Sequence, residues 1–301
     1  MKNIIKAELH KIFHSGYFYA FPCALAVILL ISYVNGGGSG SIGQNPDRNM
    51  HHVMNDTMEL IIFAVAAAGI FMVYLWNKER KNGYIKNIAG NVNGKHILTL
   101  SKLITGAVVT TIYSFVTFLF SLGFNLISCL RDGGKLIYDM YSADEMALIM
   151  ERISTLSAQK QADAIKVHEE TKSNYYYTLN TEYLAFFVWI VTGIAIIAIL
   201  LMLHELFRSA AVGYIMALQF LGGIFEGLIA QVVLLVFEFE GIMGLLLLRG
   251  TQDMLSVPIY VSHEAMSTYQ RDSVLEALLR SAMYMAVFSV LSVFISRKKD
   301  V

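Results

Sequence analysis

A glycine-rich stretch with a lysine is the first place in this sequence where chemistry could occur. Residues 90–96 read Gly-Asn-Val-Asn-Gly-Lys-His, close to the loop that cradles nucleotide phosphates in ATPases. Only three residues separate the two glycines, where that loop has four, and His96 stands where a Ser or Thr would hold magnesium. No strand-like run precedes it. The sequence therefore predicts that this chain does not itself hydrolyse ATP.

Histidines paired with acids give no catalytic or metal site. His204-Glu205 and His263-Glu264 could begin the helical zinc motif of metalloproteases, but the second histidine four residues later is missing in both. His51, His52 and Asp56 could gather a metal, yet ligand types without ligand spacing are weak evidence, and solvated loop residues are the better interpretation. We expect no catalytic residue, no metal ligand and no cofactor in this chain, and we do not predict an enzyme.

One acid lies inside a long apolar run. Glu226 stands between Gly223 and Gly227. If this run crosses a membrane, an ionisable side chain within it is costly and often functional, and glycines four residues apart let another helix approach closely. We predict that these three residues serve helix packing or a transport path. The alternative, equally open, is that Glu226 lies near the outer interface, or pairs with an arginine or the backbone there.

Composition places these residues in a membrane protein. Hydrophobic residues make up 56% of the 301 and charged residues 15%, whereas a soluble domain carries about 25% charge. Several runs of 18 or more residues hold few charges, which is the length that crosses a hydrocarbon core of about 30 Å. The alternating pattern of a membrane barrel is absent. The sequence predicts an all-α polytopic membrane protein with one transmembrane domain over residues 1–301.

We predict six membrane-spanning helices. Their approximate bounds are 17–34, 58–76, 103–130, 183–203, 210–237 and 279–295. Ahead of them, residues 1–14 have a loosely amphipathic pattern whose apolar face is interrupted by Glu8. This pattern fits a helix lying in the inner membrane interface, or equally a plain extension of the first span. Residues 238–278 contain an apolar run too short to cross, which favours a re-entrant or interfacial hairpin on the outer side.

Two further stretches lie on the outer side in this topology. Residues 35–57 are rich in glycine and polar residues, and we predict a loop. In the longer outer segment, 131–182, Ser142 and Glu145 fit a capping box, and apolar residues at helical spacing follow. We expect one exposed amphipathic helix there, then a tyrosine-rich approach to the fourth span.

Residues 77–102, named here the basic segment, set the orientation. They carry six of the chain's 23 Lys and Arg residues and one acid, Glu79. A short basic stretch between two spans belongs on the cytoplasmic side. Basic residues near both ends of the chain agree with this. We therefore expect a multi-pass protein of the cell membrane with both termini in the cytoplasm.

The order of these elements and the residues of the basic segment resemble the membrane permease subunits of the type-2 ABC transporter family. This exporter-like class moves peptides, drugs and polysaccharides. In that family a Glu and a basic residue end the second span, and a Gly, a short helix, a turn with a basic residue and a Lys entering the third span follow. The matching positions here are Glu79-Arg80, Gly83, Tyr84 to Ile88, Lys95 and Lys102. The family's usual Pro in the turn is absent, and residues 91–94 take its place.

The resemblance implies that the basic segment forms a coupling helix, which docks on a separate subunit carrying ATP and magnesium. The residues agree, because Tyr84, Ile85 and Ile88 fall close together on one helix face and Gly90 suits a helix end. The docking residues that we predict are Glu79, Arg80, Gly83, Tyr84, Ile85, Lys86 and Ile88. The alternative is that the same charges only anchor the topology and bind anionic lipid.

The same resemblance implies a transmembrane subunit of an ATP-driven transporter. Its partners would be an ATP-binding cassette subunit, a second copy or a related permease, and the lipid bilayer, with no nucleic acid. We expect an amphipathic or hydrophobic cargo, such as an antimicrobial-type peptide. A different class of function stays open, in which a membrane sensor or scaffold binds a ligand at the outer segment, 131–182, without transport.

Overall fold

Helices make up all the secondary structure of the described part of the chain. The computed structural model describes residues 2–34, 50–82, 95–131, 143–207, 211, 214 and 263–298, and no strand occurs in these ranges. The all-α prediction is confirmed for them. The predicted fifth span, 210–237, lies outside the described residues except for Ala211 and Tyr214, and so does most of the predicted hairpin.

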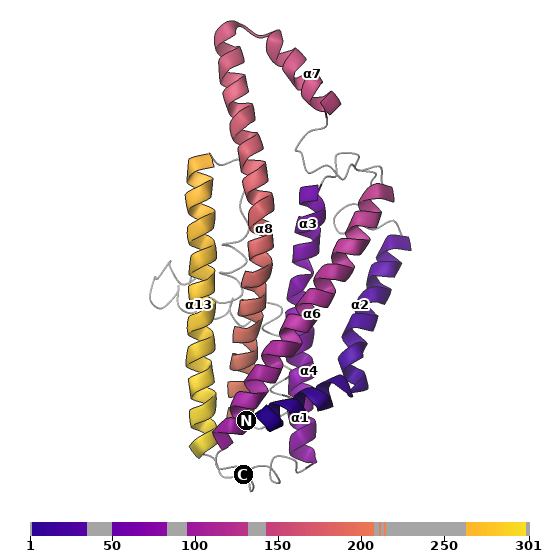
Figure 1. Cartoon of the computed structure of the whole chain (residues 1–301), viewed down its shortest axis with the longest axis vertical. Coiled ribbons are helices and arrows are strands. Elements are labelled where there is room, and N and C mark those ends of the chain that lie inside the picture. Colours follow the sequence, from indigo (N-terminus) through magenta and orange to yellow (C-terminus); the bar gives the residue numbers. More distant parts are fainter. Residues whose placement is uncertain are drawn as a thin grey trace.

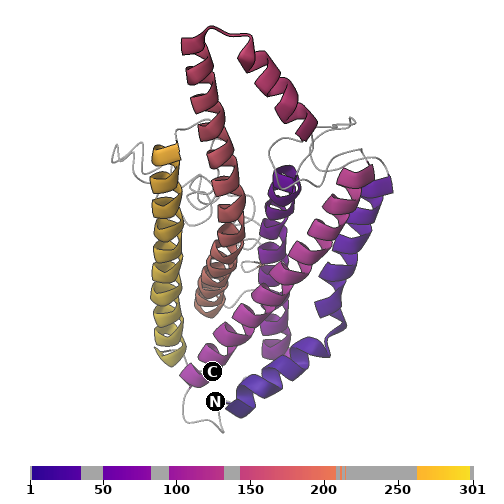
Figure 2. The ribbon, with the colours of Figure 1, turned by 45° about the horizontal axis from the view of Figure 1, so that its top comes forward.

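The described helices form an elongated bundle (Figure 1). In chain order they are α1 (Lys2–Phe13), α2 (Gly16–Val34), α3 (Met50–Glu59), α4 (Ile61–Lys81), α6 (Lys95–Arg131), α7 (Ala143–Ser154), α8 (Ala158–Phe207) and α13 (His263–Lys298). The start of α1, the end of α4, the start of α6 and the end of α13 gather at one end, which we call the base (Figures 1 and 2). Helix α7 lies at the opposite, far end.

Four helices are long and apolar enough to cross a membrane. They cover Asp56–Lys81, Ile97–Arg131, Leu184–Phe207 and Val274–Arg297, and they match the predicted second, third, fourth and sixth spans. A fifth span results if α1 and the part of α2 up to Ile31, which meet at a bend of 49°, are counted together. The described residues thus hold four to five candidate spans, and the count of six stays a prediction.

Helices α1 and α2 divide this fifth candidate into a charged part and an apolar part. All the charged residues of the pair lie on α1; they are Lys2, Lys6, Glu8 and Lys11. The turn between the helices is held by backbone bonds, in which Ser15 donates to Ile12 and Phe18 donates to Ser15. Because α2 carries no charge, we take α2 as the crossing segment and α1 as a helix that precedes it.

Three predicted boundaries are wrong, each because helical backbone extends into a polar stretch beside an apolar run. The predicted loop 35–57 ends in α3, which leads through a turn at Leu60 into α4. The outer segment 131–182 contains the expected helix, α7, but also the first half of α8, so the expectation of a single helix there fails. Helix α13 begins at His263, inside the predicted hairpin. Backbone hydrogen bonds continue a formed helix at little cost, whereas hydropathy marks only its apolar part.

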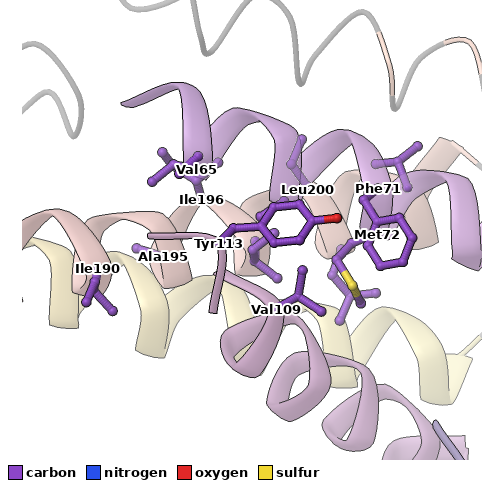
Figure 3. Packing of buried hydrophobic residues seen from close by; sticks show 14 of the residues in the cluster. Val65, Phe71, Met72, Val109, Tyr113, Ile190, Ala195, Ile196 and Leu200 are labelled. Carbon is purple, nitrogen blue, oxygen red and sulfur yellow. The ribbon is translucent and has the colours of Figure 1, made fainter. Parts of the chain in front are cut away.

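The hydrophobic core lies where α4, α6 and α8 meet. Figure 3 shows buried side chains from all three helices, among them Phe71 and Met72 of α4, Val109 and Tyr113 of α6, and Ile196 and Leu200 of α8. The Tyr113 hydroxyl donates a hydrogen bond of 2.8 Å to the carbonyl oxygen of Phe18, which ties the start of α2 to α6. Movement of α4 or α6 must therefore be shared with α8 through a packed interface.

Close helix contact in this core predicts an effect of adding one methyl group. A Cβ on Gly193 of α8 would lie 2.7 Å from Thr110 Cγ2 and 2.9 Å from Val65 Cγ2. Both neighbours are β-branched and stiff, so we expect Gly193→Ala to cost about 1–3 kcal/mol of unfolding free energy through overpacking. The measurement is a titration with denaturing detergent of the purified chain.

Gly123 of α6 supplies the matched control. A Cβ there would meet nothing within 4 Å. Gly123→Ala should therefore be neutral or stabilising by up to about 1 kcal/mol, since Ala is the better helix former. Equal stability of the two variants would show that α8 does not pack as closely on α4 and α6 as the structure has it.

Candidate functional site

The predicted docking residues fall into two groups. Glu79 and Arg80 lie in the last turn of α4, which ends at Lys81 with Asn82 as its C-cap. The other five, Gly83, Tyr84, Ile85, Lys86 and Ile88, lie outside the described residues, as do Gly223, Glu226 and Gly227. Partner docking and the roles of the glycines and Glu226 stay predictions. Within the basic segment, the structure describes the helix ends on either side of residues 83–94, at Asn82 and Lys95.

A cluster of four charged side chains joins α1, α4 and α6 at the base. The ammonium nitrogen of Lys11 lies 3.0 Å from Glu8 Oε1 and 3.0 Å from Glu79 Oε1. The ammonium nitrogen of Lys102 lies 3.6 Å from Glu79 Oε2. We call Glu8, Lys11, Glu79 and Lys102 the base cluster. Through it, one carboxylate at the end of α4 is shared by a lysine of the N-terminal helix and a lysine of α6.

Most of the base cluster is hidden from solvent. Glu8 is 5% exposed, Lys102 is 1% exposed and Glu79 is also buried, whereas the side chain of Lys11 is 32% exposed. Removing charges from water costs several kcal/mol for each ion unless they are paired. A shift of α1 or α6 along α4 that kept the site covered would leave buried charges without their partners. The cluster therefore holds the end of α4 and the first turns of α6 in fixed positions on either side of residues 83–94.

The local sequence explains why Glu79 needs two lysines. The last turn of α4 carries Lys78, Arg80 and Lys81, whose positive charges suit the negative end of the helix dipole. An acid in the same turn is unfavourable by that argument. Glu79 is tolerated because it points into the bundle, where Lys11 and Lys102 compensate its charge.

Glu8 is the residue that interrupted the predicted apolar face of α1. The structure buries it one turn before Ile12, so Glu8 belongs to the packed face and not to the exposed one. Lys11, three residues later, turns back onto it. The acid that interrupts the amphipathic pattern is thus buried and paired with Lys11 on its own helix, and Lys11 also contacts Glu79 of α4.

The environment of Glu8 makes its carboxyl group easy to protonate. Burial, the nearby Glu79 carboxylate and a hydrogen bond with it raise the pKa of Glu8 from 4.5 to about 7, against the opposing effect of Lys11. Because the folded pKa is raised, this group favours the folded state below the unfolded pKa, and that contribution is lost as pH rises through about 7. Glu8 therefore changes its charge near neutral pH.

A second polar group lies near the base cluster. His204 of α8 is buried, and its ring centroid is 5.6 Å from that of Trp76 of α4. Neither ring nitrogen of His204, nor Trp76 Nε1, has a hydrogen-bond partner among the described residues. In the same part of the chain, no group of three His, Cys, Asp or Glu side chains could hold a metal. His204 is thus a buried side chain that packs beside Trp76.

Helix α6 carries a row of neutral polar residues on one face. The buried members, at helical spacing, are Thr110, Ser114, Thr117, Ser121, Asn125 and Ser128. Asn125 donates a hydrogen bond of 3.1 Å to the hydroxyl oxygen of Thr57 on α3. The hydroxyls of Ser114, Thr117 and Ser121 have no partner in the described part of the chain. Among the buried side chains of α6, the charged Lys102 lies near the base, and hydroxyl and amide groups line the rest of this face.

Sequence reasoning missed the role of α1 in this site. Lys11 and Glu8 were not among the predicted functional residues, although Glu8 on an apolar face and Lys11 one turn later were visible in the sequence. An acid on the buried face of an amphipathic helix requires a cation nearby. That pattern predicts a charged partner for Glu8. It does not connect α1 with Glu79, since Lys11 and Glu79 are 68 residues apart in the sequence.

Comparison with known protein families matches residues 4–156 to the model described as ABC-2 family transporter protein, which is just over half of the chain. The chain belongs to the ABC-2 transporter family. The match runs from α1 through α7 and contains the base cluster and the whole basic segment. No curated protein and no solved structure matches this ABC-2 transporter.

Family membership sets the class of function. An ABC-2 transporter chain of this kind is a multi-pass membrane transport subunit, generally not catalytic, and it works with an ATP-binding cassette subunit. The predicted resemblance is therefore confirmed at the level of the family. The candidate site of this ABC-2 transporter is the base cluster together with the basic segment that emerges from it.

Proposed function

We propose that this ABC-2 transporter exports an amphipathic or hydrophobic cargo, an antimicrobial-type peptide first, across the cytoplasmic membrane. A separate subunit hydrolyses ATP with magnesium and docks on the basic segment, which faces the cytoplasm together with both termini. Two permease chains, identical or related, form the path. The basic segment passes the movement of the ATP-binding subunit into the membrane helices.

The observation that carries this proposal is the ion pair between Glu79 and Lys102. The basic segment can pass movement to the membrane helices only if both of its ends are held firmly on those helices. Glu79 lies in the last turn of α4 and Lys102 lies about two turns into α6, so their contact, at 3.6 Å, joins the two helices that flank residues 83–94. Both helices pack on α8 through the core. A push on the basic segment would thus reach three membrane helices together.

The chemistry of the bundle supports an amphipathic cargo. The chain has 15 Met residues, whose flexible side chains adapt to varied apolar shapes, together with 18 Phe and 16 Tyr residues that offer large aromatic surfaces. Away from the base, the buried polar residues of α6 are hydroxyls and one amide, from Thr110 to Ser128. Such a surface suits a molecule with neutral hydrogen-bonding groups and apolar side chains better than a strongly charged one.

Cargo-stimulated ATP hydrolysis tests the proposal. The chain is reconstituted in nanodiscs with a candidate ATP-binding cassette subunit, and hydrolysis is measured with an amphipathic peptide of low net charge and with a hydrophilic oligosaccharide. We expect a several-fold rise with the peptide and no rise with the sugar. Peptide binding to the chain alone, with no ATP-binding subunit recovered and no stimulation, would instead favour the sensor or scaffold.

A further inference from the structure

We propose that the carboxyl groups of Glu8 and Glu79 form a proton-binding site that sets how tightly α1 is held against the end of α4, at the base of the bundle. The inference deepens the function proposed above, on which its role in coupling rests. The N-terminal helix α1, which the sequence alone does not connect with the basic segment, forms part of this site.

The geometry brings two acids onto one cation. Glu8 Oε1 and Glu79 Oε1 each lie 3.0 Å from the ammonium nitrogen of Lys11, and both carboxyl groups are buried. Two buried carboxylates this close disfavour simultaneous ionisation, and the usual result is that the pair holds one proton. Lys11 is the one partly exposed member of the cluster, so solvent reaches the pair beside this side chain.

The charges facing Glu8 decide which state is favoured. Lys11 of its own helix and Glu79 of α4 act on it directly, and Lys102 of α6 approaches Glu79 from the other side. Helix α2 has no acidic or basic side chain, and Arg80 is next in sequence to Glu79. Two lysines thus face two acids. The attraction of Lys11 favours the ionised form of Glu8, whereas burial and the Glu79 carboxylate disfavour it.

Protonation changes the contact between α1 and α4. With one proton bound, the Glu8 hydroxyl donates to the Glu79 carboxylate, and Lys11 holds both groups. When Glu8 loses that proton, two negative oxygens face each other in a buried place, and the contact weakens. The shift in charge falls near pH 7, because burial and Glu79 raise the pKa of Glu8 to about 7. Acidification would therefore tighten α1 on the base, and alkaline pH would loosen it.

Hydrogen–deuterium exchange of the full chain in nanodiscs tests this inference. Protection of the α1 backbone is compared at about pH 6 and about pH 8, after correction for the intrinsic exchange rate. We expect several-fold weaker protection at the higher pH in the natural chain and no such change in Glu8→Gln, which mimics the protonated group. Glu151→Gln, an exposed acid on α7, should behave as the natural chain does.

Infrared spectroscopy supplies a second readout that does not depend on the motion of α1. The band of a protonated carboxylic acid should disappear with a midpoint near pH 7 and be absent from the difference spectrum of Glu8→Gln. No titrating band near neutral pH, or the same pH response in Glu8→Gln as in the natural chain, would overturn the proton site. If the natural chain shows no pH response but still binds the ATP-binding subunit, only this inference is refuted. If the natural chain shows the pH response but does not bind that subunit, only the proposed function is refuted.

Discussion

Replacing Tyr84 and Ile85 by aspartate is expected to remove the ATP-binding subunit from this transporter. In a coupling helix these two side chains lie on one face, and docking would bury them against the partner. Central anchors of an interface cost about 2 kcal/mol or more each when truncated, and a buried, unpaired carboxylate adds to that loss. Because every 1.4 kcal/mol is tenfold in affinity, we expect binding to fall by at least about 100-fold.

The measurement is affinity purification of the chain, with the ATP-binding subunit quantified in the eluate. Leu148→Asp with Met150→Asp is the matched control, since both residues are exposed apolar side chains on α7, at the far end of the bundle (Figure 1). That variant should retain the subunit. If the Tyr84 and Ile85 variant also retains it, the basic segment is a topology anchor and lipid contact, and the docking prediction fails.

Replacing Glu79 by glutamine is expected to lower the unfolding free energy by about 3–5 kcal/mol. The change leaves Lys102, which is 1% exposed, without the carboxylate that compensates it. Breaking a buried ion pair from one side is strongly destabilising for this reason. Lys102→Met should cost clearly less, because Glu79 then keeps its 3.0 Å contact with Lys11.

Detergent-denaturation curves of the single and double variants test this asymmetry. The double variant Glu79→Gln with Lys102→Met should recover much of the loss, since no buried lysine is left unpaired. Glu276→Gln, an exposed acid on α13, should change stability by less than about 0.5 kcal/mol. If the losses of the two single variants simply add, Glu79 and Lys102 are not coupled, and the base cluster does not hold the helices as described.

The sequence predicted the parts of this fold that depend on local pattern. Long apolar runs located α2, α4, α6, the second half of α8 and α13, because a membrane helix must satisfy its backbone internally over a fixed length. The capping pattern at residues 142–145 located α7. Polar helical extensions, such as the start of α8 at Ala158, were missed because hydropathy does not distinguish a polar helix from a polar loop.

The candidate site was only half predictable, because it joins distant residues. The basic segment and Glu79 stood out by charge, and Lys102 by its place at the start of a span. Glu8 and Lys11 did not, since their contact with Glu79 depends on how α1 lies against α4. A single charge on an apolar face gives notice of such a contact, but the three-dimensional packing decides its partner.

Site-specific photo-cross-linking in intact membranes tests the central claim most directly. A benzophenone amino acid is placed at Tyr84, and in a second chain at Leu148, each produced together with the ATP-binding subunit. We predict a cross-linked product of the chain and that subunit from position 84 and none from position 148. No product from position 84, or equal products from both positions, would contradict the account.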